Sequence, residues 1–340
     1  MFDVRKRLRL LVPLGLITAT YPAAQATSPE SRTPHILWGI NESGLEVGRG
    51  DKVGKNFVVP NPSYYLAHRV RLVRLPFRMS RLQPVPHGPL DPTYVEDIRH
   101  IVSQDHAAGA ITVLDPHGYG FYDSDGKPHD IAADATARAN YVDLMSRIAA
   151  AFAHEPVAID LMNEPHTGSD AEYAPVWNEA IAAVRQAGFR GTILVPHCHW
   201  STAADISPQR PFEGRIVDSG HDWVLELHSY LDPDGTGTYR QPVATDKIGA
   251  SRLAGAIAWS RQTRIRLFLG ETGAPPDAIS VAGLKAMYQT ILLAPDVFWG
   301  IAIWGGGPWF KPDYSMRLDP VGGADRPQFQ ALEEAFRGQT

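Results

Sequence analysis

Two glutamates, each placed directly after an apolar run, are the residues of this sequence best suited to do chemistry together. Glu164 follows the run 157–163 in "VAIDLMNEP", and Glu271 follows the run 265–270 in "IRLFLGETG". A pair of carboxylic acids can divide acid–base work, because one can hold a proton while the other is ionised. Two carboxylic acids that flank a bond are also what hydrolysis of a glycosidic bond requires.

Other polar and aromatic residues also follow apolar runs, namely Arg74, His117, Asn163, His228, Tyr230 and Trp304. Arg74 and Tyr230 can both donate to Glu271, and a cation and a donor favour the ionised form of a carboxylic acid. We therefore expect Glu271 to be the nucleophile and Glu164, near that negative charge, to be the acid. Glu164 would then serve as base toward water, and this double displacement predicts carboxyl groups roughly 5–5.5 Å apart. A structural ion pair with Arg74 is the alternative.

The elements that must position these residues are apolar runs that alternate with amphipathic ones. Strands are expected at 35–41, 70–75, 110–115, 157–163, 192–196, 223–228, 265–270 and 298–304. Each run is nearly continuous, as is typical of a strand buried on both faces of a parallel sheet. Helices are expected at 91–109, 132–153, 171–188, 245–262, 280–294 and 327–336, several of them with capping residues at the start and glycine at the end.

Eight strands, spaced roughly 35 residues apart with helices between them, predict an α/β fold, a single-domain (β/α)₈ TIM barrel. Active residues of such barrels lie at the carboxyl ends of the strands, and residues about three units apart, such as Glu164 and Glu271, face each other across the mouth. An open doubly wound sheet is the alternative. It would require a glycine-rich phosphate loop after its first strand, and "GINESGLEVG" lacks that spacing.

Charge and cysteine content bound the class of protein further. The net charge is −5 over 340 residues, and no basic patch indicates a nucleic-acid partner. The single cysteine, Cys198, excludes an intrachain disulfide. No stretch after the amino terminus is long and apolar enough for a membrane helix.

The amino terminus has the pattern of a targeting segment. A basic start, a short apolar run at 10–19 and "AAQA" predict a secretory signal peptide at 1–26, then a short leader at 27–34 and a catalytic domain at 35–340. An uncleaved membrane anchor is the alternative. Export without disulfides indicates a bacterial periplasmic or secreted protein, which we expect to be a monomer free of the membrane once the signal is removed.

Taken together, these motifs resemble glycoside hydrolase family 5, the cellulase family. The matching stretches run in order from about Gly39 to Pro320 and are "RLPF", "LDPHGYG", "NEP", "LHSYLD", "GETG" and "WGGGPW". "RLQP", "YLDPDGTGT" and "GPW" resemble the branch that holds many fungal and bacterial endo-β-1,4-glucanases. The resemblance implies a retaining endo-β-1,4-glucanase that acts on a β-glucan and needs no cofactor.

The resemblance also implies residue roles. Arg74 and Tyr230 would hold the nucleophile, Asn163 and His117 would bind sugar hydroxyls, and His228 would tune the acid. Tryptophan rings can carry sugar rings, because pyranose faces pack well on large aromatic surfaces. The expected platforms are Trp304 and, as further candidates, Trp309, Trp38 and Trp200, whereas Trp177 and Trp259 on helices are expected in the core.

Two departures from the family pattern leave the substrate open. Thr272 stands where the family usually has an aromatic residue, and "PHCHWS" stands where it reads closer to "GNYW" or "GNSW". Mannan, mixed-linkage glucan, xyloglucan or a bacterial exopolysaccharide would fit the same mechanism, because specificity lies in loop contacts.

Two other classes of function compete with this one. A non-catalytic sugar-binding barrel would be expected to have lost one carboxylate. A metal-dependent hydrolase could use the histidines at 117, 197, 199 and 228, but it would want His-x-His after the first strand, where this chain has "GIN". We therefore expect no metal in catalysis and interpret His197 and His199 as groove or loop residues. "DPDGTGT" lacks the distal glutamate of a calcium loop.

Overall fold

The computed structural model of the protein describes residues 35–48 and 57–339. The predicted signal peptide at 1–26 and leader at 27–34 lie outside the described residues. Among the helices that are described, none is both long and apolar enough to cross a membrane.

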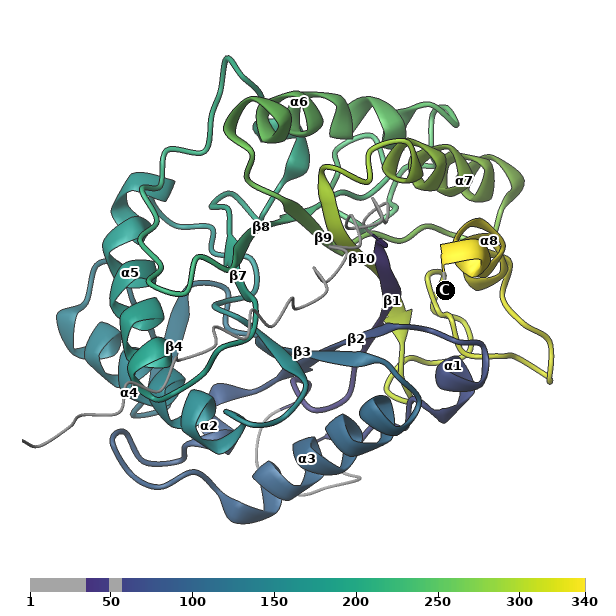
Figure 1. Cartoon of the computed structure of the whole chain (residues 1–340). Helices are drawn as coiled ribbons and strands as arrows, with labels where there is room; N and C mark the ends of the chain where they lie inside the picture. The colour runs from purple at the N-terminus through teal and green to yellow at the C-terminus, as the bar shows by residue number, and fades with distance from the viewer. Residues whose placement is uncertain (1–34, 49–56, 340) are drawn as a thin grey trace, which may run out of the picture. The chain divides into compact units, whose positions relative to one another are not determined.

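Eight parallel strands form a closed barrel, which confirms the predicted fold (Figure 1). The strands are β1 (Leu37–Glu42), β2 (Leu72–Phe77), β3 (Ile111–Pro116), β6 (Val157–Asp160), β7 (Ile193–Pro196), β8 (Trp223–His228), β9 (Leu267–Glu271) and β10 (Phe298–Gly306). Neighbours around the ring follow the order β1-β10-β9-β8-β7-β6-β3-β2. The first and last strands close it, with Leu37 opposite Gly300 and Ile40 opposite Ile303.

Helices surround the strands in Figure 1. They are α1 (Ser63–Ala67), α2 (Met79–Leu82), α3 (Pro92–Ala107), α4 (Ala135–Ala151), α5 (Asp170–Gln186), α6 (Ile248–Thr263), α7 (Ala278–Leu292) and α8 (Pro327–Phe336). The last six correspond to the predicted helices. Asp91 caps α3 by accepting the Tyr94 N–H, and Pro92 occupies the first turn, as the sequence indicated. Between β7 and β8 the chain forms the 3₁₀ turn η1 (Ala203–Asp205) in place of a longer helix.

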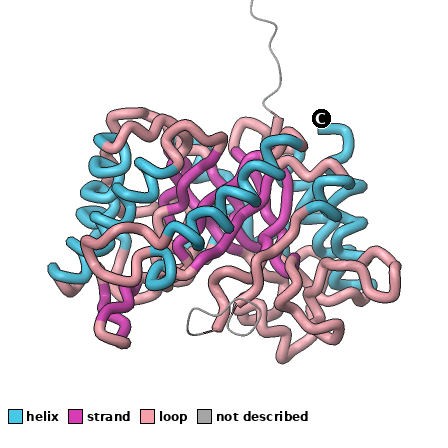
Figure 2. Tube along the Cα trace, turned by 90° about the horizontal axis from the view of Figure 1, so that it is seen from below, coloured by secondary structure: helices cyan, strands magenta, loops and turns pink. Residues whose placement is uncertain are grey.

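A hairpin that the sequence analysis did not predict extends the loop after β3. Its strands are β4 (Phe121–Ser124) and β5 (Lys127–Asp130), paired antiparallel. Asp125 and Gly126 form the turn with φ of +53° and +72°, the backbone that a two-residue hairpin loop of type I′ needs. In side view, long loops gather at one end of the strands (Figure 2).

Side chains fill the inside of the barrel in layers. The lower layer is apolar and consists of Leu72, Val113, Ala158, Leu194, Val224, Phe268 and Ala302. Two residues further along β2, β3, β6 and β8, on the same face of each strand, the interior becomes charged, with Arg74, Asp115, Asp160 and Glu226. The barrel interior thus changes from apolar to charged over two residues of each of these strands, and the charged layer positions the candidate site.

Candidate active site

A buried arginine lies at the centre of the charged layer. Arg74 contacts four carboxylates, those of Asp115, Asp160, Glu226 and Glu271, at 3.0 Å each. Burial alone would lower the pKa of Arg74, but these carboxylates raise it well above its usual value. Arg74 is therefore a permanent cation, and its Nη1 and Nη2 donate to Glu271, Asp160 and the side-chain oxygens of Asn41 and Asn163.

The acids around Arg74 differ in protonation. Burial, with the charge of Glu226 added, raises the pKa of Asp160 well above its usual value, which favours its protonated form. Burial also opposes ionisation of Asp115, but Arg74 and His117 outweigh it and lower the pKa of that carboxyl group. The layer thus carries fewer negative charges than its composition suggests.

Glu271 ends β9 and accepts two hydrogen bonds. Arg74 Nη1 donates to Oε1 across 3.0 Å, and the Tyr230 hydroxyl donates to Oε2 across 2.7 Å. Burial raises the pKa of Tyr230 well above its usual value, so this hydroxyl stays a donor. Burial also raises the pKa of Glu271, the charge of Glu164 adds to this, and His228 and Arg74 oppose it. The direction differs from the expectation drawn from the two donors alone, because burial of the carboxyl group outweighs them.

Glu164 lies opposite Glu271 at the mouth of the barrel. One oxygen of each carboxylate and a ring nitrogen of His228 all lie within 4.8 Å of one another. His228 Nδ1 is 2.7 Å from Glu164 Oε1. Burial would lower the pKa of His228, but the neighbouring carboxylates raise it well above its usual value. Glu164 also has a φ of +43°, a left-handed backbone that is uncommon for a residue with a side chain.

His117 and Asn163 stand beside this pair. His117 Nδ1 lies 2.8 Å from Asp115 Oδ2, and its Nε2 lies 3.3 Å from Asn163 Nδ2 and 3.1 Å from the Tyr119 hydroxyl. The Asn163 side-chain oxygen accepts from Arg74 Nη2 across 2.9 Å. The structure therefore brings together all seven predicted polar residues, Arg74, His117, Asn163, Glu164, His228, Tyr230 and Glu271.

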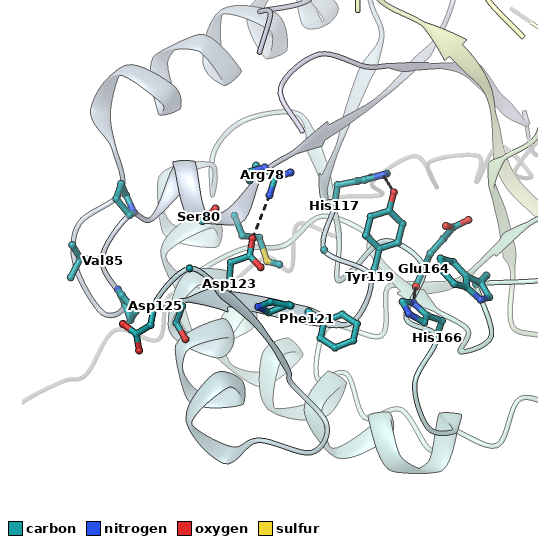
Figure 3. A pocket seen from close by; sticks show the side chains of 18 residues that line it. Arg78, Ser80, Val85, His117, Tyr119, Phe121, Asp123, Asp125, Glu164 and His166 are labelled. Carbon is teal, nitrogen blue, oxygen red and sulfur yellow. Dashed lines mark hydrogen bonds and ion pairs between the residues drawn. The ribbon is translucent and has the colours of Figure 1, made fainter. Parts of the chain in front are cut away.

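A groove of about 1100 Å³ runs from Glu164 toward the β4–β5 hairpin (Figure 3). Figure 3 shows His117, Tyr119, Glu164 and His166 at one end and Val85 and Asp125 at the other. Trp200 also lines the groove and stacks on His166, with ring centroids 3.9 Å apart and planes 6° from parallel. An open, elongated groove next to two carboxylates fits a polymer better than a small enclosed substrate.

Residues 65–291 match the family model described as Cellulase (glycosyl hydrolase family 5). The chain belongs to glycosyl hydrolase family 5. Endoglucanase 3 of Humicola insolens is 28% identical over 342 residues, which cover 95% of this chain and 86% of that protein. The family 5 membership confirms the resemblance drawn from the motifs, and with it the glycoside hydrolase class.

Solved structures resemble this family 5 barrel closely. An endo-β-1,4-glucanase of Xanthomonas axonopodis pv. citri, solved with three mutations, is 30% identical with a TM-score of 0.82, and the match covers 89% of this chain and 99% of that one. A complex of XacCel5A with cellopentaose is 29% identical with a TM-score of 0.82 and covers 89% and 100% of the two chains.

The predicted platform tryptophans of this family 5 protein lie in different environments. Trp200 is 48% exposed and lines the groove. Trp304 stacks on His117, with ring centroids 5.8 Å apart and planes 19° from parallel. Trp304 therefore lies next to a residue of the candidate site. Trp309 is 42% exposed in the loop after β10 and is not among the residues that line the groove.

Trp38 was predicted wrongly as a platform candidate. It is 1% exposed and stacks on Phe336 of α8, with centroids 6.3 Å apart. Side chains alternate along a strand, and Asn41 of β1 points into the barrel to contact Arg74. Trp38 therefore points outward, into the layer between strands and helices. Trp177 and Trp259, predicted as core residues, are buried.

Sequence reasoning missed three acids of the family 5 site, Asp115, Asp160 and Glu226. Each interrupts an otherwise apolar strand, as in "TVLDP", "VAIDLM" and "VLELH". Asp115 and Glu226 also precede His117 and His228 by two positions, so each pair shares one face of its strand. This two-residue spacing could have identified Asp115 and Glu226 as residues of the site. Nothing in the local sequence indicated the roles of Tyr119 and His166, because their contacts come from other loops.

Proposed function

We propose that this family 5 enzyme is a retaining endo-β-1,4-glucanase. The observation that carries the proposal is the spacing of the two carboxylates, whose nearest oxygens lie within 4.8 Å across the barrel mouth. Retaining glycosidases hold their carboxyl groups about 5–5.5 Å apart, whereas inverting enzymes need about 6.5–9.5 Å to admit a water. The spacing of Glu164 and Glu271 fits the retaining class.

The contacts of the two acids support different roles. Glu271 receives hydrogen bonds from Arg74 and Tyr230, and both donors keep their protons near neutral pH. These donors stabilise the ionised form that a nucleophile needs. Glu164 lines the groove and is hydrogen-bonded to His228, which can supply or stabilise a proton there. We therefore assign the acid/base role to Glu164.

The reaction then proceeds in two balanced steps. Glu164 gives its proton to the glycosidic oxygen as Glu271 attacks the anomeric carbon, so the bond to the leaving sugar breaks and a glycosyl ester forms on Glu271. Ionised Glu164 then takes a proton from water, whose oxygen attacks the same carbon and releases Glu271. His117 and Asn163 are placed to bind hydroxyls of the cleaved unit, and Trp304 to carry its ring.

A β-1,4-glucan is the substrate best supported by the relatives. Those from Humicola insolens and Neurospora crassa are named endoglucanases, and XacCel5A was solved with cellopentaose. The same two steps would cleave another β-glycan if the loops that carry Thr272 and His197–Trp200 selected one, so the assay must include several polymers.

We also propose that the protein is exported and acts as a monomer in the periplasm or outside a bacterial cell. The pattern of residues 1–26 supports export. One chain supplies both the groove and the two carboxylates, so the proposed reaction needs no second copy.

The decisive experiment compares reducing-sugar release by the wild type, Glu271→Gln and Glu179→Gln. The substrates are carboxymethylcellulose, barley mixed-linkage glucan, glucomannan and xylan. We expect wild-type activity to be greatest on the β-1,4-glucans and to fall by several orders of magnitude in Glu271→Gln, since the swap keeps size and removes the nucleophile. Glu179, half-exposed on α5, is the matched control and should be neutral.

Two results would contradict the proposal. Equal activity of wild type and Glu271→Gln would remove Glu271 from the mechanism. Absence of activity on every polymer, with a folded protein, would favour a sugar-binding barrel. The anomeric configuration of the first product, followed by NMR, tests the retaining class separately and should be β.

A further inference from the structure

Two histidines and an aspartate cluster in the loop after β7, apart from the catalytic pair. His197 follows β7 directly, His199 comes two residues later, and Asp205 ends η1. One potential ligand atom of each residue, a ring nitrogen or a carboxylate oxygen, lies within 4.8 Å of the other two. The two imidazole rings are 5.8 Å apart and stand at 73° to each other.

His197 has the hydrogen-bond pattern of a metal-binding histidine. Its Nδ1 lies 2.8 and 3.0 Å from the two carboxylate oxygens of Asp170, at the start of α5, so Nδ1 carries the hydrogen. Its Nε2 is then a bare acceptor. A histidine whose second nitrogen donates to a carboxylate is the usual arrangement of a metal-binding imidazole, because the carboxylate fixes the tautomer and the ring plane.

The acceptor of His197 is buried without a partner. Only 6% of the His197 side chain is exposed, and within residues 35–48 and 57–339 no group hydrogen-bonds to its Nε2. A buried polar atom without a partner destabilises the folded protein. Binding of an ion by Nε2 would remove this cost, and it is this atom, rather than the cluster alone, that indicates a ligand.

His199 and Asp205 complete the cluster from the solvent side. Their side chains are 57% and 28% exposed, and His199 Nδ1 lies 3.9 Å from Asp205 Oδ2. A tetrahedral Zn²⁺ with ligand atoms at about 2.0–2.1 Å holds those atoms about 3.4 Å from one another. The ligand atoms of the cluster would therefore have to move by less than about 1.5 Å to bind the ion. The exposed His199 ring can make this movement by rotation. Arg210 contacts the other oxygen, Asp205 Oδ1, across 3.0 Å and so leaves Oδ2 toward His199.

We propose that His197, His199 and Asp205 form a binding site for one divalent transition metal ion, best matched by Zn²⁺ with water as the fourth ligand. Two imidazoles and one carboxylate are ligands that suit Zn²⁺. Ca²⁺ and Mg²⁺ prefer oxygen ligands and should bind this set poorly. The site is structural, since none of its ligands contacts either catalytic glutamate.

Such an ion would hold the loop that carries Trp200. His199, Trp200 and Ser201 have φ of +59°, +61° and +53°, so three consecutive residues adopt a left-handed backbone that costs free energy. The Trp200 N–H donates to the Pro165 carbonyl across 3.2 Å, and the Ser201 carbonyl accepts the His228 N–H across 2.6 Å. Metal binding would therefore stabilise one wall of the groove. This consequence rests on the proposed function, whereas the site itself does not.

The test uses the full chain treated with a chelator and then titrated with Zn²⁺, with calorimetry and thermal unfolding as readouts. We expect one Zn²⁺ per chain and a higher Tm for the wild type, and at least tenfold weaker binding for His199→Ala and for Asp205→Asn. His129→Ala is the matched control, because His129 faces Asp134 at 3.4 Å on the far hairpin and is also part-exposed. It should bind like the wild type, and Ca²⁺ should leave Tm unchanged.

A second readout reports on the ligands themselves. Co²⁺ in place of Zn²⁺ should give the visible absorption of a tetrahedral ion in the wild type and not in His199→Ala. The catalytic cluster of Glu164, His228 and Glu271 is the competing location for an ion. Zn²⁺ binding that survives His199→Ala and Asp205→Asn but is lost in Glu164→Gln would overturn the proposal, as would no binding by the wild type. Glucanase assays enter none of these readouts, so failure of the proposed function would be seen separately.

Discussion

Tyr230 and Glu271 lie 2.7 Å apart, with the hydroxyl hydrogen directed at carboxylate Oε2. This bond favours the ionised carboxylate against a burial that raises its pKa. Because a nucleophile must be ionised, activity should be lost as pH falls through a value above about 4.3, the ordinary pKa of glutamate.

Tyr230→Phe removes that donor and keeps the ring. We expect the pKa of Glu271 to rise further, so the acidic limb of kcat/KM should move to higher pH and kcat should fall by about tenfold or more. The measurement is a pair of pH profiles on one soluble glucan. Tyr122→Phe, a buried tyrosine that bonds to Gln83, is the control and should leave the limb in place. An unshifted limb in Tyr230→Phe would show that this bond does not set the charge of Glu271.

Glu164→Gln should separate substrates by their leaving groups. Proton donation is worth about 10²–10⁴-fold, and it matters most when the leaving oxygen is a poor one. We expect a loss of this size on glucan and a much smaller loss in the first step on a dinitrophenyl cellobioside. Stopped-flow release of dinitrophenol measures that step. An equal loss on both substrates would argue against the acid role.

The barrel could be predicted because its strands are buried on both faces, so each reads as a nearly continuous apolar run. The β4–β5 hairpin could not, since "FYDSDGKPHD" has no apolar alternation and only its Asp125–Gly126 turn carries a signal. A run that is apolar throughout also hides which side chains point inward. Trp38 was misjudged for this reason.

Trp38→Ala tests that correction directly. Removing a buried tryptophan that packs against α8 should lower the free energy of unfolding by about 3–5 kcal/mol. KM should stay the same in the folded fraction, because the ring lies outside the barrel interior. Urea unfolding and steady-state kinetics check the two halves. A raised KM with unchanged stability would restore Trp38 as a sugar platform.

The stacking of Trp200 on His166 predicts that variants of these two residues change KM much more than kcat. Such an aromatic contact is worth about 0.5–1.5 kcal/mol, so His166→Ala should raise KM for cello-oligosaccharides by about two- to tenfold with little change in kcat. Trp200→Ala should raise KM more, because it removes the exposed face as well. Leu293→Ala, at an exposed residue after α7, is the control. A fall in kcat alone would contradict a platform role.

Asp105 should make stability depend on pH. It is buried in the last turn of α3, accepts the Thr112 hydroxyl across 2.7 Å, and burial raises its pKa to about 7. The folded protein then holds this proton up to about pH 7 and the unfolded chain releases it near 3.9. Stability should therefore fall as pH rises from about 4 to 7, by up to about 4 kcal/mol.

Asp105→Asn should abolish this slope, as an amide does not titrate. Urea unfolding at several pH values measures it, and Glu96→Gln, at an exposed residue of the same helix, should keep the wild-type slope. Parallel slopes in wild type and Asp105→Asn would show that Asp105 is ionised in the folded protein.

From the sequence, we could predict only those site residues that directly follow an apolar run. Glu164, Glu271, Arg74 and His228 do so, because polar residues after apolar runs are conspicuous. The net charge state could not be predicted, since it depends on how many acids surround Arg74 and on how deeply they are buried. Asp160 shows this most clearly, because burial inside the barrel and then the charge of Glu226, from another strand, raise the pKa of an aspartate that reads as an ordinary strand residue in the sequence.

Main-chain hydrogen bonds from Trp200 to Pro165 and from His228 to Ser201 join the segments after β6, β7 and β8. In a chimera with a relative, these three segments should therefore be exchanged together. A chimera that received residues 197–205 alone would set the Trp200 amide and the Ser201 carbonyl against loops after β6 and β8 that come from the other parent, so both bonds would depend on loops not matched to them. Recombination of this barrel with a relative should therefore succeed when the crossovers lie before β6 and after β8, and should fail when one lies between them. New substrate preference would then be inherited together with the acid that serves it.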